Sequence, residues 1–145
     1  LGQVLYDGKD LWIIDFEGEP ALSISERRLK RPPMADVAGM IRSFHYAAQA
    51  ALLKEIESGG AAPAHTDVLA DWAQFWARHV SAIFYRAYLD ASKDAGFLPA
   101  KDDDVQLLTN IFLLRKAIYE LGYELNNRPN WVKIPLLGIL ELMAG

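Results

Sequence analysis

Two polar side chains bracket a short β-unit at the start of the chain. Gln3 precedes the apolar run Val4-Leu5-Tyr6, and Asp15 follows the apolar run Leu11-Trp12-Ile13-Ile14. The intervening Asp7-Gly8-Lys9-Asp10 is typical of a turn, so we expect two antiparallel strands. Antiparallel partners run back along each other, which places both polar side chains at the same end of the hairpin, nearly level, with Cβ atoms roughly 5 Å apart. Amide and carboxylate oxygens at that spacing suit a hard cation, and we predict that Gln3 and Asp15 bind Mg²⁺.

Asp15 also has a simpler interpretation, because an aspartate at the end of a strand is a common turn former. Two more carboxylates follow it, Glu17 and Glu19. Either of them could orient a metal-bound water. Either could instead cap the loop or pair with Arg27 or Arg28, and the sequence leaves these roles open.

A second group of reactive side chains lies in the block 119–131, which mixes aromatic rings with amide, carboxylate and guanidinium groups. Sugars suit such a mixture, because their C–H faces lie on rings while their hydroxyl groups need fixed donors and acceptors. Several of these residues recur at spacings of three and four and so share one side of a helix end. The predicted sugar-binding residues are Glu120, Tyr123, Glu124, Asn127 and Arg128.

The same block can equally be a satisfied helix end. In that interpretation Asn126 or Asn127 caps the helix, Arg128 pairs with Glu124, and Trp131 packs in the core. The two interpretations are evenly balanced on the sequence alone.

Helical periodicity dominates the chain after residue 33, where apolar residues recur at spacings of three and four. Gly59-Gly60 ends the first helix, Thr66 is expected to cap the second, and Asp102-Asp103-Asp104 suits the positive end of the third. A last helix is expected near Pro135, a residue tolerated in the first turn. The predicted elements are a hairpin at 3–15, a loop at 17–33 and helices at about 34–57, 66–93, 102–126 and 135–144.

These elements predict a mainly α fold class, with a short antiparallel hairpin followed by about four helices. The chain has 145 residues and is 52% hydrophobic, which is enough for one core, so we expect a single domain over 1–145.

Several blocks of the sequence resemble the bacterial maltokinases, which are members of the protein-kinase-like, aminoglycoside-phosphotransferase-like superfamily and are often fused to trehalose synthase. The blocks occur in the same order from Leu1 to about the last helix, which indicates a family more strongly than a lone Asp-Phe-Glu does. They are Leu-Gly-Gln-Val-Leu at 1–5, Asp-Phe-Glu-Gly-Glu-Pro at 15–20, Arg27-Arg28-Leu29-Lys30, Asp-Val-Ala-Gly-Met-Ile-Arg-Ser-Phe at 36–44, and Tyr-Glu-Leu-Gly-Tyr-Glu-Leu-Asn-Asn-Arg-Pro at 119–129.

This resemblance implies roles for both groups of residues. Gln3 would correspond to the catalytic-loop amide and Asp15 to the aspartate of the Asp-Phe-Gly motif, which hold the Mg²⁺ ions of ATP. The implied fold is the C-lobe of a kinase, with the loop 17–33 covering the active-site mouth. The parent enzyme would phosphorylate maltose with ATP to give maltose 1-phosphate, for trehalose or α-glucan metabolism, and maltose would bind at the C-terminal block.

The sequence departs from the family pattern at its start. The pattern is His-Gly-Asp-x-His-Leu-Gly-Gln, in which the aspartate is the catalytic base, and this chain begins at Leu1-Gly2-Gln3. We therefore expect a C-lobe fragment that is inactive alone, with the base upstream of Leu1 and the N-terminal lobe as its missing partner. A fused trehalose synthase domain is a further possible partner.

A rival interpretation keeps the fold and removes the chemistry. The chain would then be a helical docking module of a trehalose synthase–maltokinase fusion. The hairpin would expose apolar side chains such as Leu5, Trp12 and Phe16, and such a patch favours self-association. A third interpretation is a related kinase for another small substrate, which differs from the maltokinase only in the sugar pocket.

Composition excludes several other classes. The net charge is −4 and the one basic run, at 27–31, is short, so nothing indicates nucleic-acid binding. The absence of cysteine and the separation of His45, His65 and His79 exclude thiolate and paired-histidine zinc sites. No serine has the glycine pattern of a nucleophile elbow, which removes support for a hydrolase. The sequence has no apolar run of membrane-spanning length and no secretory leader, so we expect a cytoplasmic protein.

Overall fold

The computed structural model describes residues 1–16, 18, 22–60 and 62–144. The chain divides into two compact units, residues 1–32 and residues 33–145. No helix in the described ranges combines the length and the apolar character needed to cross a membrane.

The first unit contains a hairpin of β1 (Val4–Tyr6) and β2 (Leu11–Ile13), which pair antiparallel with Val4 opposite Ile13. Asp7 fixes the turn: its Oδ1 accepts from the backbone N–H of Lys9 and Asp10, and its Oδ2 accepts from the Trp12 indole. These hydrogen bonds favour the ionised carboxylate and lower the pKa of Asp7 to about 2. The turn that the sequence predicts is therefore held by an aspartate side chain.

A one-turn helix, α1 (Ile24–Arg27), lies in the segment that we expected to be a loop without helical structure. Its cause is a capping box, in which Ser23 Oγ accepts from the Glu26 N–H and the Glu26 carboxylate accepts from the Ser23 N–H. The expected loop at 17–33 is corrected over these residues.

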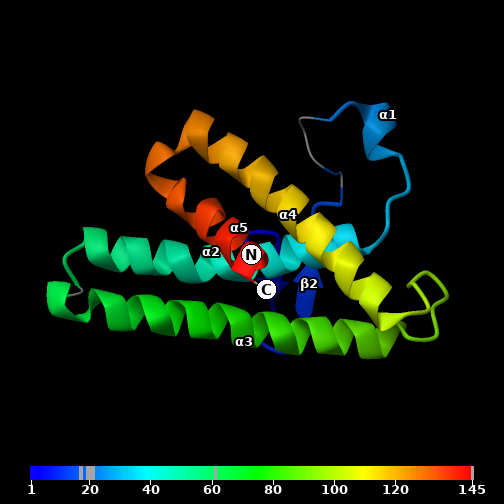
Figure 1. The fold of residues 1–145 in the computed structure, drawn as a ribbon, viewed down its shortest axis with the longest axis horizontal. Helices are drawn as coiled ribbons and strands as arrows, with labels where there is room; N and C mark the ends of the chain where they lie inside the picture. Colours follow the sequence, from blue (N-terminus) through cyan, green and yellow to red (C-terminus); the bar gives the residue numbers. More distant parts are fainter. Residues whose placement is uncertain (17, 19–21, 61, 145) are drawn as a thin grey trace. The chain divides into compact units, whose positions relative to one another are not determined.

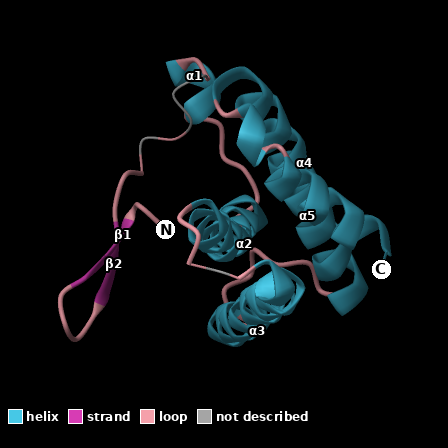
Figure 2. Ribbon diagram, turned by 90° about the vertical axis from the view of Figure 1, so that its left-hand side faces the viewer, coloured by secondary structure: helices cyan, strands magenta, loops and turns pink. Residues whose placement is uncertain are grey.

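The second unit is a helical bundle centred on α2 (Met34–Glu57). Helix α3 (Thr66–Ser92) follows a 3₁₀ turn at Pro63–His65 and runs back along α2 (Figure 1). Helix α4 (Asp102–Asn127) then crosses this pair, and a second 3₁₀ turn at Pro129–Trp131 leads into α5 (Lys133–Ala144) (Figure 2). Helix α2 contacts α3, α4 and α5, so it is the element that the others share.

Apolar residues from four helices form the core of this bundle. The buried ones are Met34, Val37, Ala38 and Ala48 of α2, Ala77 of α3, Val105 and Ala117 of α4, and Ile134 of α5. Buried polar side chains run through the same core, notably Arg42, His45, Thr109, Glu120 and Glu124. Burying a polar group costs free energy unless the group is paired. The partners of these side chains therefore determine what this part of the chain can do.

The predicted fold class is confirmed: the chain is mainly α, with an antiparallel hairpin followed by helices. The first three long helices lie within one residue of the predicted ranges at each end. The last helix begins at Lys133 instead of Pro135, because the 3₁₀ turn at Pro129–Trp131 runs directly into it. Thr66 is the first helical residue of α3, and His65 takes the capping position. The single-domain assignment stays a prediction.

The aromatic residues of α3 are more exposed than their periodicity suggests. Trp72 is 63% exposed and Trp76 is 44% exposed. Both border an apolar groove of about 620 Å³ whose α2 wall includes Ala47, Ala48 and Ala51. Small side chains on α2 leave the indole rings without a deep pocket, although both rings lie on the apolar stripe of α3.

Candidate functional site

Gln3 and Asp15 meet at the open end of the hairpin. The Gln3 Nε2 donates a hydrogen bond of 2.6 Å to Asp15 Oδ2, and both residues are exposed. The two side chains that could share a cation therefore lie side by side, within the first unit.

The strand register differs in one respect from the expected arrangement. Val4 pairs with Ile13, and the Ile14 N–H donates to the Gln3 carbonyl at 3.0 Å, so Gln3 lies level with Ile14. Regular alternation would direct the next side chain, Asp15, to the opposite face of the ribbon. Asp15 instead has φ = 65°, the one positive φ outside glycine in the described ranges. This conformation rotates Cβ about the N–Cα bond and allows the carboxylate to reach Gln3.

The backbone conformation of Asp15 is itself informative. A non-glycine residue with positive φ is uncommon, although aspartate and asparagine adopt it more readily than most. Such residues concentrate at functional sites, where the local geometry is held for a purpose. The observation supports a hypothesis of function at Asp15.

The donor set at Gln3 and Asp15 fits a magnesium ion that is shared with a phosphate ligand. Mg²⁺ takes oxygen ligands, keeps several waters and commonly uses only one or two protein carboxylates together with substrate phosphates. A half-turn of the Gln3 amide brings its oxygen beside the Asp15 carboxylate. No cluster of three or more histidine, cysteine, aspartate or glutamate residues that could hold a metal occurs in the part of the chain that the structure describes. Glu17 and Glu19, the other two carboxylates considered, lie outside the described residues.

Glu120, in the predicted sugar-binding block, is buried and paired. Arg42 of α2 donates from Nε to Glu120 Oε2 at 2.8 Å, and its Nη2 lies 2.8 Å from the same oxygen. Burial raises the pKa of Glu120, while the Arg42 guanidinium acts in the opposite direction. This carboxylate therefore joins α4 to α2.

Glu124, one turn further along α4, is 1% exposed and has two partners. Tyr46 of α2 donates its hydroxyl to Glu124 Oε1 at 3.1 Å, and Arg128 donates to both carboxylate oxygens, at 2.9 and 2.6 Å. The hydrogen bonds to Glu124 raise the pKa of Arg128. The pairing of Arg128 with Glu124, expected if the block is a satisfied helix end, is thus observed.

The remaining residues of the block form its exposed surface. Arg128 lies over the rings of Trp131 and Tyr123, with its Cζ 4.3 and 5.5 Å from the two centroids. Tyr123 is 48% exposed. Asn127 donates its amide to the Tyr123 carbonyl at 2.8 Å, which satisfies the helix end. A ligand at this block would meet Tyr123, Asn127 and Arg128, with Glu124 holding the arginine from below, and the sugar-binding assignment stays a prediction.

Sequence reasoning missed the residues of α2 that hold this block. Arg42, His45 and Tyr46 sit among apolar residues of α2, and the first two are buried. Ala38, Arg42, His45 and Gln49 follow one another at spacings of four, three and four, which continue the buried stripe of the helix. An arginine and a histidine on an apolar stripe indicate that polar partners for them lie elsewhere in the core, and this signal could have been used.

Comparison with known proteins relates the chain to small-molecule kinases. It is distantly similar to glucosamine kinases, which are phosphotransferases of the aminoglycoside-phosphotransferase-like superfamily. Two of these relatives are a glucosamine kinase of Streptacidiphilus jiangxiensis, 26% identical over 145 residues and 99% of this chain, and one of Mycolicibacterium smegmatis, 32% identical over 136 residues and 93% of this chain. The chain spans 30% of the length of each relative. No protein-family model matches it.

The fold agrees with this similarity. A two-stranded antiparallel hairpin followed by a helical bundle is consistent with a portion of a kinase-like C-lobe. The maltokinase resemblance is supported only at this coarser level, because the relatives are named for glucosamine.

Proposed function

We propose that this chain is the C-lobe portion of an ATP-dependent sugar kinase, with Gln3 and Asp15 as the protein ligands of magnesium. The observation that carries the proposal is the 2.6 Å contact between the Gln3 amide and the Asp15 carboxylate, formed through a positive φ at Asp15. The similarity to one glucosamine kinase extends over 99% of the chain, this segment included, and supports the kinase class of the proposal.

The magnesium ion and the side chains of this protein have different roles in the proposed reaction. Magnesium bound with ATP would neutralise phosphate charge that otherwise repels a nucleophile, and phosphoryl transfer depends mainly on such electrostatics and on positioning. Asp15 would supply a negative ligand on a fixed backbone, and Gln3 a neutral one. Both side chains are exposed, which leaves them accessible to a nucleotide.

Two sugars are candidates for the acceptor. The resemblance to maltokinases suggests maltose, whose product would be maltose 1-phosphate. The names of the two relatives suggest glucosamine. The proposed contact surface is the exposed part of the 119–131 block, where Tyr123 offers a ring face and Asn127 and Arg128 offer polar groups.

The test uses the full-length protein that contains this chain. Purified protein is incubated with ATP and Mg²⁺ and with maltose, glucosamine, glucose or an aminoglycoside, and sugar phosphate is measured directly. A sugar kinase gives sugar phosphate with a clear preference for one of the first two acceptors. Activity confined to the aminoglycoside, or no phosphorylated product with any acceptor, contradicts the proposal.

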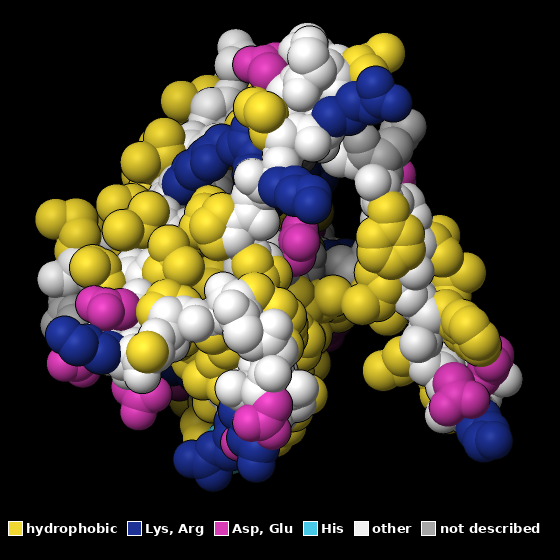
Figure 3. Space-filling model, turned by 90° about the vertical axis from the view of Figure 1, so that its right-hand side faces the viewer, with side chains coloured by type: hydrophobic (Ala, Val, Ile, Leu, Met, Phe, Trp, Pro, Cys, Tyr) yellow, Lys and Arg dark blue, Asp and Glu magenta, His cyan; other side chains and the backbone are white. Residues whose placement is uncertain are grey.

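A second candidate function rests on the exposure of the hairpin. Leu5, Trp12 and Phe16 are 52%, 57% and 84% exposed. Figure 3 shows hydrophobic side chains along the hairpin up to its charged turn. A docking module would need such a surface, and its partner would be another lobe or domain of the same protein. Normal kinase activity in a full-length Trp12→Ser/Phe16→Ser variant would argue against an essential docking role.

A further inference from the structure

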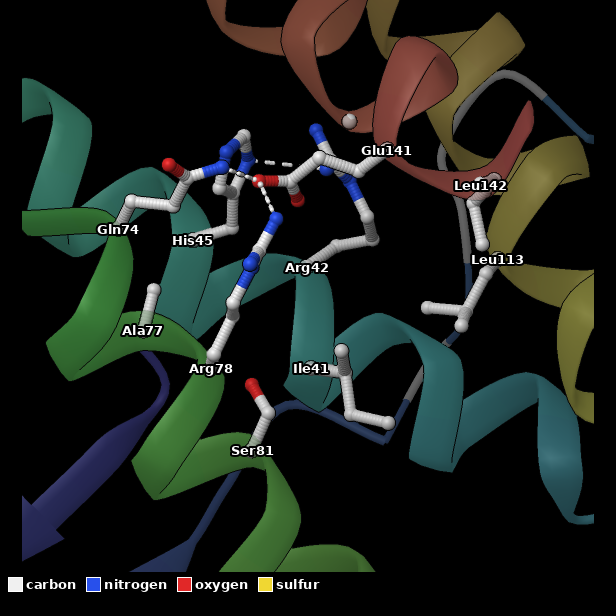
Figure 4. Close-up of a pocket in the computed structure, with 11 residues that line it drawn as sticks. Ile41, Arg42, His45, Gln74, Ala77, Arg78, Ser81, Leu113, Glu141 and Leu142 are labelled. Carbon is white, nitrogen blue, oxygen red and sulfur yellow. Dashed lines mark hydrogen bonds and ion pairs between the residues drawn. The ribbon is translucent and has the colours of Figure 1, made fainter. Parts of the chain in front are cut away.

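A cavity of about 260 Å³ opens between α2, α3 and α5, with one wall from α4 (Figure 4). Its apolar walls include Ile41, Ala77, Leu113 and Leu142. Its polar side chains are Arg42, His45, Gln74, Arg78, Ser81 and Glu141. None of these residues belongs to the proposed metal site or to the proposed sugar-binding block.

His45 lines this cavity and carries a buried donor without a partner. It is 6% exposed, and Arg42 Nη1 lies 2.9 Å from its Nδ1. Since a guanidinium only donates, Nδ1 must accept, and the proton of the neutral ring is on Nε2. Nε2 is buried and has no hydrogen-bond partner among the described residues. A buried donor without a partner is costly, which indicates that something absent from the chain itself completes it.

The two arginines that face the cavity are each paired with a glutamate, so their charges are balanced. Arg42 is paired with Glu120 at 2.8 Å, and Arg78 is paired with Glu141 at 3.3 Å. Glu141 Oε1 also accepts from the Gln74 amide. Burial, reinforced by the neighbouring Arg42, lowers the pKa of His45 to about 4, so the ring is neutral at pH 7. A neutral occupant therefore suits the cavity better than a free anion or cation.

Gly138 of α5 shapes the polar end of the cavity. A Cβ at this position would collide with the Arg42 guanidinium, so the glycine allows Arg42 to lie directly against the helix backbone. This packing fixes Arg42, and through Nη1 it fixes the ring of His45. The unpaired donor is thus held by residues of two helices.

A single water does not account for the cavity. The share of liquid volume per water is about 30 Å³, so the space is on the order of eight waters. Several waters would be poorly held, because much of the wall is aliphatic. An occupant with an apolar face and hydroxyl groups satisfies both kinds of wall.

We propose that this cavity binds a small neutral polyol no larger than a monosaccharide. One hydroxyl accepts from His45 Nε2–H and can donate to the Glu141 carboxylate, while the C–H face lies against Ile41, Leu113 and Leu142. Binding here needs neither ATP nor Mg²⁺, so it can fail or hold independently of the proposed kinase function.

The test observes the histidine side chains of the 145-residue chain by ¹H–¹⁵N NMR at pH 7. D-glucose is the probe, and sodium acetate at the same concentration tests for an anion site. We expect a saturable shift of the His45 ring nitrogens with D-glucose and none with acetate. The exposed His65 and His79 serve as internal controls. No saturable shift with D-glucose, or a larger response to acetate, overturns the proposal.

Variants then locate the site. Leu142→Trp fills the cavity without removing a polar group and should abolish the shift, whereas Leu140→Trp, on the exposed side of the same helix, should leave it unchanged. His45→Gln keeps an acceptor for Arg42, but its flexible amide N–H₂, although a donor itself, is not held by a ring at the position of Nε2. It should weaken D-glucose binding about tenfold, read from the Gly138 amide, as expected for one lost hydrogen bond. Unchanged affinity in both Leu142→Trp and His45→Gln places the sugar elsewhere and contradicts the assignment.

Discussion

Arg42 of α2 and Glu120 of α4 form a buried ion pair in the core of the second unit. The Nε–Oε2 distance is 2.8 Å, and the two side chains are 5% and 11% exposed. The pair connects the central helix to the helix that carries the predicted sugar-binding block. It also belongs to a wider set of buried polar contacts, because Arg42 holds His45 and rests on Gly138.

Removing one partner of this pair should destabilise the chain far more than removing both. Arg42→Met or Glu120→Met alone leaves a buried charge without its partner, and we expect a loss of about 3–5 kcal/mol of unfolding free energy. The double variant Arg42→Met/Glu120→Met should recover much of that loss, because it leaves no buried charge at the pair. Urea unfolding of the four proteins measures this coupling. Single variants that lose less than about 1 kcal/mol would show that the pair is effectively solvated.

Gly138 should not tolerate alanine. The added Cβ collides with Arg42 Nη1, and moving the guanidinium strains its pairing with Glu120. We expect Gly138→Ala to destabilise the chain by about 1–3 kcal/mol, as overpacking does.

Gly122→Ala is the matched control, since its Cβ would meet nothing within 4 Å on α4. It should stabilise the chain by about 0.5–1 kcal/mol through helix propensity. Equal effects of the two substitutions in thermal unfolding would argue against close packing of Arg42 on α5.

Tyr46 should contribute through its hydroxyl. Tyr46→Phe removes the donor to Glu124, a buried carboxylate that keeps Arg128 as its other partner. We expect a loss of about 1–2 kcal/mol, typical of a hydrogen bond to a charged group. Tyr123→Phe, at a half-exposed ring, should change stability by less than about 0.5 kcal/mol. A Tyr46→Phe protein as stable as the parent would contradict the contact.

Stability should fall below pH 6.5 because of His45. Its pKa is lowered from 6.5 to about 4 in the folded chain, so between these values the unfolded state binds the extra proton. Stability therefore rises with pH across this window and is lost as the pH falls through it. The shift corresponds to on the order of 3 kcal/mol.

Other groups facing His45 also titrate or carry charge, namely Arg42 on its own helix, Arg78 of α3, Glu120 of α4 and Glu141 of α5. The raised pKa of Glu120 has the opposite effect on stability. Just above pH 4.5 the folded state binds the extra proton at this carboxyl group, so its contribution to stability falls as the pH rises. The difference between the parent and His45→Gln isolates the histidine contribution. Parallel pH profiles for the two proteins would contradict a buried neutral His45.

The sequence predicted the elements well where local signals decide. The apolar stripes and the Gly59-Gly60 stop located α2 and α3, and Asp7-Gly8-Lys9-Asp10 located the hairpin turn. The short helix α1 was missed although Ser23 and Glu26 have capping-box spacing, because no apolar period accompanies them. The capping-box residues indicated the start of a helix, but helices were predicted only from apolar periodicity.

The site was less predictable, because its contacts join distant residues. Strand pairing indicated that Gln3 and Asp15 share one end of the hairpin, but not that a positive φ at Asp15 produces their contact. Arg42 reaches Glu120 across 78 residues of sequence, and a single sequence carries no signal for that pairing. The same applies to Gly138, whose role depends on a side chain from another helix.

The most direct measurement is magnesium-dependent phosphoryl transfer by the full-length protein carrying Asp15→Asn. Asparagine tolerates the same positive φ, so the hairpin should survive while the negative ligand is lost. Asp10→Asn, in the exposed turn of the same hairpin, is the matched control. We predict that Asp15→Asn lowers kcat by roughly 10²–10³, typical of losing one electrostatic contact to the transition state, while Asp10→Asn keeps parental activity. An Asp15→Asn enzyme as active as the control would contradict the assignment of Asp15 to the magnesium site.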